Sequence, residues 1–264
     1  MKKLVAIDLD GTLLNDDLRL PSLSKEVLLK LNEEGFLIIL ATGRPFRALS
    51  SFYNAVKLTH PVICYNGALA FDPLDASFVP LKKKFAVSDI VSIFSLVKDK
   101  TTSFMCETHK KIYSTVFDSY LDHYFPYNSM DFLKGDIDMT LHEDVYTAIM
   151  RSEKKDDEMI EKTVTSHPNI LYRHWTESPY SECFLKGVDK GVALQYIMDH
   201  YGIKKEDVYA FGDSNNDFEM LSLSGHPFAM KGSKSSRLKT SFPLTEEGNN
   251  DEGVAKTLQS LFIK

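Results

Sequence analysis

Long apolar runs are missing from this sequence, which excludes an integral membrane protein from the predicted classes. No uninterrupted apolar stretch in the 264 residues approaches the roughly 18 residues that a membrane-spanning helix needs. Lys2 and Lys3 precede a short apolar segment, but Asp8 and Asp10 interrupt it, which is not the pattern of a secretory signal peptide. We therefore expect no membrane partner.

Cysteine and excess positive charge are also scarce. The three cysteines are widely spaced, at Cys64, Cys106 and Cys183, so neither a disulfide framework nor a Cys-x-x-Cys metal site is visible. A reduced, cytoplasmic location is the expectation. The formal net charge is −6, which argues against a nucleic-acid partner. With 43% hydrophobic residues, the chain can form a core in one large domain or two smaller ones.

The first apolar segment carries the most informative pattern. Residues 4–7 read as a buried strand that runs directly into Asp8-Leu9-Asp10-Gly11-Thr12. Asp and Gly are common in turns, so an ordinary strand-end turn is one interpretation. Two carboxylates ~4 Å apart repel by about 4 kcal/mol at an effective dielectric near 20, however, and a cation would remove that cost. The pair therefore suggests a cation site at the end of a strand.

Strands and helices alternate around this segment, which predicts an α/β fold with a doubly wound parallel sheet. Helix 21–34 is followed by strand 36–40, and a third strand is expected at 62–65. The same alternation resumes late in the chain, with a helix from Lys190 to Gly202 and a strand at 208–211. Further helices are expected at 218–223 and 254–262.

The middle of the chain has a different texture and predicts an inserted α+β unit. A helix is indicated by the spacing of Ile90, Ile93, Phe94 and Val97. Strands are expected at 103–107, 112–115, 137–141, 170–175 and 181–185, and a charged helix at 155–166. We expect residues 1–82 and 186–264 to form the core domain and residues 83–185 to form the insert.

Polar residues follow two further strands of the predicted core sheet. Thr42 and Gly43 follow the second strand, and Asp213, Asn216 and Asp217 follow the strand at 208–211. Ligands of such sheets bind outside the carboxyl ends of the strands. Carboxylates there suit Mg²⁺, which binds one or two carboxylates together with phosphate oxygens and water.

These segments together resemble the haloacid dehalogenase superfamily, and more narrowly its Cof-type phosphatases. Four motifs occur in the family's order: Asp8-Leu9-Asp10-Gly11-Thr12, Ala41-Thr42-Gly43-Arg44, Asp189-Lys190-Gly191 and Gly212-Asp213-Ser214-Asn215-Asn216-Asp217. Two shorter runs, Asn66-Gly67-Ala68 and Asn250-Asp251-Glu252-Gly253-Val254-Ala255, also match. The resemblance implies a Rossmann-like core with an inserted α/β cap, and a phosphatase of small phosphorylated metabolites, with sugar phosphates expected.

The resemblance also implies how the four acids share the chemistry. Asp8 would be the nucleophile that becomes an aspartyl phosphate, and Asp10 would act first as general acid and then as general base. Mg²⁺ would bind the Asp8 carboxylate, the Asp10 backbone carbonyl and Asp213. Asp217 would hold a metal-bound water or orient Lys190.

The transferring phosphate would be held by a further set of groups that the resemblance implies: Leu9 and Gly43 through their N–H groups, together with Thr42, Lys190 and Asn216. Asn66 is a supporting residue in this interpretation. Arg44 either contacts the substrate or lies on the surface at a helix start. The run Met230-Lys231-Gly232-Ser233 departs from the Met-Gly-Asn-Ala that Cof-type proteins usually carry.

The insert offers polar candidates for substrate contacts, and each has a solvent-exposed surface residue as its alternative: Glu107, His109, Lys110, Arg173, His174, Trp175 and Glu182. Trp175 is expected in the core rather than against a ligand. Two other functions stay open at this point. A phosphomutase would share the aspartyl-phosphate step, and a non-catalytic phosphometabolite sensor would bind without turnover. We expect a monomer or a homodimer.

Overall fold

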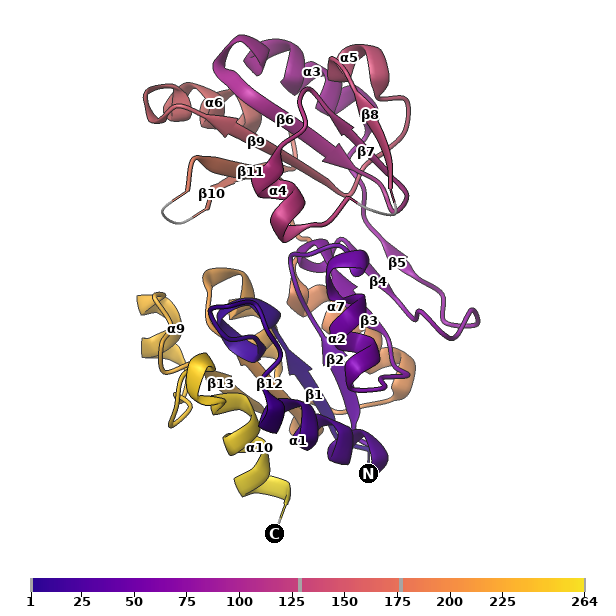
Figure 1. Ribbon diagram of the computed structural model, residues 1–264, viewed down its shortest axis with the longest axis vertical. Coiled ribbons are helices and arrows are strands. Elements are labelled where there is room, and N and C mark those ends of the chain that lie inside the picture. The colour runs from indigo at the N-terminus through magenta and orange to yellow at the C-terminus, as the bar shows by residue number, and fades with distance from the viewer. Residues whose placement is uncertain (1, 128–129, 176–177, 264) are drawn as a thin grey trace. The chain divides into compact units, whose positions relative to one another are not determined.

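The computed structural model describes residues 2–127, 130–175 and 178–263, which fold into two compact units (Figure 1). The first unit combines Met1–Lys82 with Asp189–Lys264, and the second is Lys83–Val188. The chain leaves the first unit after Lys82 and returns to it at Asp189, so the second unit is an insertion. Among the helices of the described ranges, none is both long enough and apolar enough to cross a bilayer.

The first unit is built on a parallel sheet, as the alternation of strands and helices predicts. Its strand order is β13-β12-β1-β2, with every neighbouring pair parallel. The bounds are β1 Leu4–Ile7, β2 Leu37–Leu40, β12 Val208–Gly212 and β13 His226–Ala229. A parallel bridge from Ala41 to Ile63 continues the sheet to β3 (Val62–Cys64). Beyond it, β3, β4 (Leu69–Phe71) and β5 (Leu81–Lys82) form an antiparallel ribbon.

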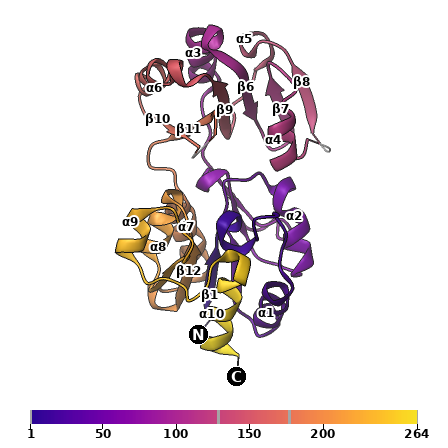
Figure 2. The same cartoon turned by 60° about the vertical axis from the view of Figure 1, so that its left-hand side comes forward.

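Helices cover both faces of this sheet (Figure 2). In that view α1 and α10, which contact each other, lie on one side, and α7 and α8 lie on the other. The helices of the unit are α1 Ser22–Glu33, α2 Phe46–Ala55, α7 Lys190–Tyr201, α8 Phe218–Leu223, α9 Ser236–Ser241 and α10 Gly253–Phe262. Coverage on both faces explains why all four residues of β1 are buried.

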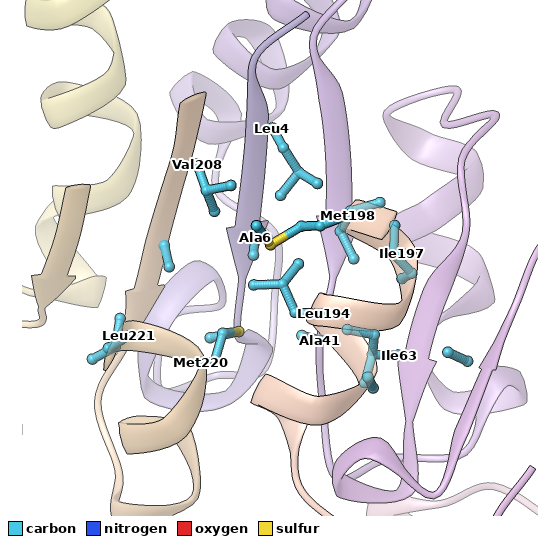
Figure 3. Packing of buried hydrophobic residues seen from close by; sticks show 14 of the residues in the cluster. Leu4, Ala6, Ala41, Ile63, Leu194, Ile197, Met198, Val208, Met220 and Leu221 are labelled. Atoms are coloured by element: carbon cyan, nitrogen blue, oxygen red, sulfur yellow. The ribbon is translucent and has the colours of Figure 1, made fainter. Parts of the chain in front are cut away.

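The core under α7 shows how sequence period becomes packing. Successive strand side chains point to opposite faces, so Leu4 and Ala6 share one face of β1. On α7, Leu194 lies about one helical turn before Ile197 and Met198. All three belong to the same buried cluster as the two strand residues (Figure 3). This packing fixes the start of α7 against the sheet.

The second unit has a six-stranded sheet of order β10-β11-β9-β6-β7-β8, antiparallel except for β7 with β8. Its strands are β6 Thr101–Glu107, β7 Lys111–Ser114, β8 Asp131–Lys134, β9 Thr147–Ser152, β10 Ile170–His174 and β11 Tyr180–Leu185. Its helices are α3 Val87–Val97, α4 Ser119–Tyr124, α5 Ile137–Thr140 and α6 Asp157–Thr165. Alternate strand residues form two clusters, so both sheet faces carry apolar side chains.

One strand prediction in this unit is wrong. Residues 137–141 are expected to be a strand, but Ile137–Thr140 is the short helix α5. Ile137 and Leu141 are buried while Met139 is 74% exposed, which is the i, i+4 pattern of a helix face. Ile137, Met139 and Leu141 alternate as the residues of a strand would, but only Ile137 and Leu141 reach the core.

Candidate active site

Three strand ends meet at one edge of the first unit's sheet. Ile7 is in register with Leu40 of β2 and with Phe211 of β12. The Asp8 N–H donates to the Phe211 carbonyl at 3.1 Å, which places the residue after β1 beside the residue after Phe211. The first, second and fourth motifs are therefore brought to the same level by the parallel register, as strand ends of such a sheet require.

Lys190 joins these motifs through two short ion pairs. It is the first residue of α7 and is fully buried. Its Nζ lies 2.6 Å from Asp8 Oδ1 and 2.6 Å from Asp217 Oδ1. The helix start is fixed by Asp189, whose carboxylate accepts from the Val192 N–H at 2.8 Å. Lys190 is thus a buried cation between two carboxylates.

The Asp217 carboxylate accepts hydrogen bonds at both of its oxygens. Its Oδ1 accepts from Lys190, and its Oδ2 accepts from the N–H groups of Asp213 and Ser214, each at 3.0 Å. The close approach requires glycine at position 212, because a Cβ there would lie 2.4 Å from the Cβ of Asp217. Asp217 therefore contacts both Lys190 and the backbone of the fourth motif.

A group of three carboxylates could hold a metal ion. Among the described residues, Asp8, Asp213 and Asp217 each offer one carboxylate oxygen, and these oxygens lie within 4.8 Å of one another. Thr12 Oγ1 donates to Asp213 Oδ1 at 3.3 Å. Gly11 has a φ of 75° and packs so closely that a Cβ there would lie 2.6 Å from Asp213 Oδ2. The first motif thus forms one wall of the acidic group.

The carboxylates of this group carry more negative charge than the Lys190 ammonium neutralises. Burial raises the pKa of Asp8 well above its usual range, Lys190 partly offsets this, and the neighbouring aspartates raise it further. Burial and the charge of Asp217 raise the pKa of Asp213 to about 7. Burial alone would lower the pKa of Lys190, but Asp217 and Asp8 outweigh it and raise that pKa above its ordinary value. One lysine therefore does not neutralise the group, and a divalent cation fits it.

Asp10 points to a different partner. Its carboxylate accepts from Arg44 Nε at 2.7 Å and from Arg44 Nη2 at 2.5 Å, a two-pronged pair. The side chain of Asp10 is 44% exposed, whereas Arg44 as a residue is only 6% exposed. The alternative of Arg44 as a surface residue is therefore wrong. Its guanidinium is thus a charged partner of the expected acid–base residue.

The second motif packs against the loop that carries Asn66. Thr42 is buried, and its Oγ1 accepts from the Arg44 N–H at 3.1 Å. Asn66 has a φ of 54°, and its Oδ1 accepts from Asn216 Nδ2 at 2.9 Å. A Cβ at Gly43 would lie 3.1 Å from the Asn66 amide. The loop thereby links the second motif to the fourth.

All the residues expected at the site from the sequence, including Leu9 in the turn Leu9–Leu13, lie in the first unit at or beside these strand ends. Two contributors had no assigned role in the sequence analysis. Thr12 belongs to the first motif, so its position already pointed to it. Ser233, which donates to the Asp213 carbonyl at 2.5 Å, lies in the run that departs from the family pattern.

The candidate residues of the second unit have different environments. Glu107 and Glu182 are buried, so for these two the surface alternative is wrong. Arg173 forms an ion pair with Glu182. Trp175 packs against the apolar cluster that contains Tyr180, in agreement with the core expectation. Two more candidates, His109 and Lys110, follow β6 in the connection to β7, and His174 is exposed at the end of β10.

Comparison with known proteins identifies the family. A model of haloacid dehalogenase-like hydrolases matches residues 5–258. The chain belongs to the haloacid dehalogenase-like hydrolases. The match covers nearly the whole chain and confirms the resemblance that the four motifs indicate.

Two relatives of this haloacid dehalogenase-like hydrolase are named as phosphatases. It is 30% identical over 264 residues to the 5-amino-6-(5-phospho-D-ribitylamino)uracil phosphatase YitU of Bacillus subtilis strain 168, covering 98% of this chain and 97% of the relative. It is 27% identical to the phosphatase YcsE of the same strain, which is named for the same substrate, covering 97% and 94%. The chain is accordingly a phosphatase.

Solved structures confirm the fold of this hydrolase. A haloacid dehalogenase-like hydrolase from Bacteroides thetaiotaomicron superposes with a TM-score of 0.86 at 22% identity, covering 99% of this chain and all of the other. A subclass IIB sugar phosphatase superposes with a TM-score of 0.80 at 20% identity, covering both chains fully. At these identities the likeness establishes the fold.

Proposed function

We propose that this phosphatase hydrolyses phosphate monoesters of small metabolites, sugar phosphates above all, through an aspartyl phosphate on Asp8 and with Mg²⁺ as cofactor. The observation that carries the proposal is the Asp8 carboxylate at the end of β1, 2.6 Å from the buried Lys190 ammonium. A nucleophilic carboxylate with a fixed cation beside it suits an attack on phosphorus, where negative charge must be stabilised.

The proposed reaction has two displacements on phosphorus. In the first, an Asp8 oxygen forms a bond to phosphorus while the bond to the leaving oxygen breaks, and Asp10 gives its proton to that oxygen. In the second, Asp10 takes a proton from water, the water oxygen bonds to phosphorus, and the bond to Asp8 breaks. Lys190 and Asn216, with the N–H groups of Leu9 and Gly43 and the Thr42 hydroxyl, would hold the transferring oxygens.

The acidic group supports the cofactor part of the proposal. Asp8, the Asp10 backbone carbonyl and Asp213 would hold Mg²⁺, an oxygen-rich set of the kind that this ion prefers. The raised pKa values of Asp8 and Asp213 support this part of the proposal, because Lys190 only partly offsets the burial of the carboxylates and their repulsion. When bound, Mg²⁺ would neutralise charge on the phosphoryl oxygens.

The substrates for which two relatives are named support the proposed substrate class. YitU and YcsE are named for a substrate with a phosphate on a ribityl chain, a polyhydroxylated carbon chain. A phosphorylated polyol or sugar would present the same ester to Asp8. We further propose that the second unit, Lys83–Val188, is a cap domain. Three buried free cysteines fit a reducing, cytoplasmic location.

A phosphate-release screen tests the proposed reaction. Purified protein is incubated with Mg²⁺ and a panel that includes sugar phosphates, ribityl phosphates, nucleotides and phosphorylated amino acids. We expect free phosphate from several sugar or polyol phosphates and little from the other classes. Isomerised product without free phosphate would instead identify a phosphomutase, and binding without any product would identify a sensor. Either result would overturn the proposed function.

The pKa of Asp213 predicts how metal binding depends on pH. With a pKa of about 7, this carboxyl is protonated in metal-free protein at lower pH, and Mg²⁺ must displace the proton. The Kd for Mg²⁺ should therefore rise as the pH falls below 7, by up to about tenfold per unit of pH. Calorimetric titration between pH 5.5 and 8.5 measures this, and EDTA should abolish turnover throughout. A Kd independent of pH would contradict the assignment of Asp213 as a ligand.

The same shift has a consequence for stability. Between about pH 4 and pH 7 the folded protein binds a proton at Asp213 that the unfolded chain has lost. The free energy of unfolding of metal-free protein should therefore fall as pH rises through this window. Added Mg²⁺ should restore stability above pH 7, because the ion replaces the proton.

A further inference from the structure

The segment after β13 runs beside the fourth motif and is bonded to it at three points. The Met230 N–H donates to the Gly212 carbonyl at 2.9 Å. Ser233 Oγ donates to the Asp213 carbonyl at 2.5 Å, and Ser235 Oγ donates to Asn215 Oδ1 at 2.6 Å. The bonds follow the motif in order, so residues 230–235 support the loop that carries Asp213. This is the same run in which the sequence departs from the family pattern.

The hydroxyl of Ser233 has a defined direction. Ser233 is only 4% exposed, and its Oγ accepts from the Ser235 N–H at 3.1 Å. A hydroxyl has a single proton, and here it points to the Asp213 carbonyl. The contact is therefore a fixed, buried hydrogen bond, unlike those that surface serines exchange with water.

Asp213 is consequently held at both of its peptide groups. Its N–H donates to Asp217 Oδ2 at 3.0 Å, and its carbonyl accepts from Ser233. Two fixed peptide planes fix the direction in which the Asp213 side chain leaves the backbone. Thr12 and Gly11 then contact the carboxylate itself.

We propose that Ser233 is a positioning residue that sets the affinity of the acidic group for Mg²⁺. The inference rests on the proposed function, since it assumes that Asp213 binds the ion. Removing the hydroxyl leaves the Asp213 carbonyl without this donor and frees the peptide to rotate. Mg²⁺ binding must then also order the Asp213 side chain, which costs free energy. Groups that orient metal ligands typically change metal affinity by about 10- to 100-fold. Ser233 acts on the backbone of the ligand, so we place its effect at the lower end.

Ser224 provides a matched control. It is 3% exposed in the same unit, and its Oγ donates to the Leu221 carbonyl at 2.9 Å. Ser224→Ala thus removes the same kind of buried bond at the C-terminal end of α8, the end away from Asp217. Ser233→Cys keeps the shape of the side chain with a larger atom that is a weaker donor, and Ser233→Thr keeps the hydroxyl.

The experiment is calorimetric titration of metal-free, full-length protein with Mg²⁺ at pH 8, with thermal unfolding in EDTA as the parallel measure of folding. We expect Ser233→Ala to weaken Mg²⁺ binding about tenfold, Ser233→Cys less, and Ser233→Thr and Ser224→Ala hardly at all. Turnover of Ser233→Ala should recover at saturating Mg²⁺. An unchanged Kd in Ser233→Ala, or an equal loss in Ser224→Ala, would overturn the inference. If Ser233→Ala does not fold, Ser233→Cys decides between the same two outcomes.

The titration also separates this inference from the proposed function. Wild-type protein that binds no Mg²⁺ contradicts both. Wild-type protein that binds Mg²⁺ with the same affinity as Ser233→Ala contradicts only the role of Ser233.

Discussion

Replacing Asp8 with Asn should reduce phosphate release by at least about 10⁴-fold, the scale of loss seen when a nucleophile is removed. The amide cannot form the acyl phosphate, and it is a poor metal ligand. The variant should nevertheless fold. Burial already raises the pKa of Asp8 well above its usual range. A neutral side chain of the same shape therefore removes the electrostatic cost of burying the native carboxylate. Thermal unfolding in EDTA should show no loss of stability.

A surface aspartate gives the control for this experiment. Asp207→Asn makes the same change of charge just before β12, at the opposite end of that strand from Asp213. It should keep wild-type turnover. Rapid quenching of wild-type protein with substrate, followed by peptide mass spectrometry, should find phosphate on the peptide that contains Asp8. Measurable turnover in Asp8→Asn at the wild-type rate, or phosphate on another residue, would refute the proposed nucleophile.

Replacing Lys190 with Met should cost both activity and stability. Lys190 is fully buried and forms ion pairs with Asp8 and Asp217 at 2.6 Å each. Breaking a buried pair by removing one partner costs about 3–5 kcal/mol, because an uncompensated charge stays in the interior. We expect a loss of that size in the free energy of unfolding at pH 8. The loss should shrink at acidic pH, where the carboxylates are protonated.

The stability effect can be separated from the catalytic one. The double variant Lys190→Met/Asp217→Asn removes one of the stranded charges, so it should regain part of the lost stability and stay inactive. Lys205→Met is the control, since its Nζ donates to the Ser222 carbonyl at an exposed position. Urea unfolding and phosphate release measure the two effects. Full activity in Lys190→Met, or a double variant no more stable than the single one, would contradict the assignment.

Local signals sufficed for the parallel core. The apolar run that forms β1 is short and bounded by Asp8, and the helices that become α1 and α7 end at glycines, so each element could be predicted from neighbouring residues. The second unit was harder. Its central strand β9 (Thr147–Ser152) was not predicted, since five of its six residues are buried and its apolar residues do not alternate with polar ones. The alternation at 137–141 predicted a strand where the structure has a helix.

The sequence by itself determined the family, the parallel sheet and the identity of the residues at the strand ends, because motifs and punctuation residues are local patterns. Only the tertiary structure decided which groups meet. Lys190 and Asp8 are far apart in the chain, yet parallel register and the packing of α7 bring them to 2.6 Å. The pairing of Arg44 with Asp10, and the bond from Ser233 to the Asp213 carbonyl, likewise depend on packing between distant segments. No spacing in the sequence encodes such contacts, since their geometry is set by the whole core.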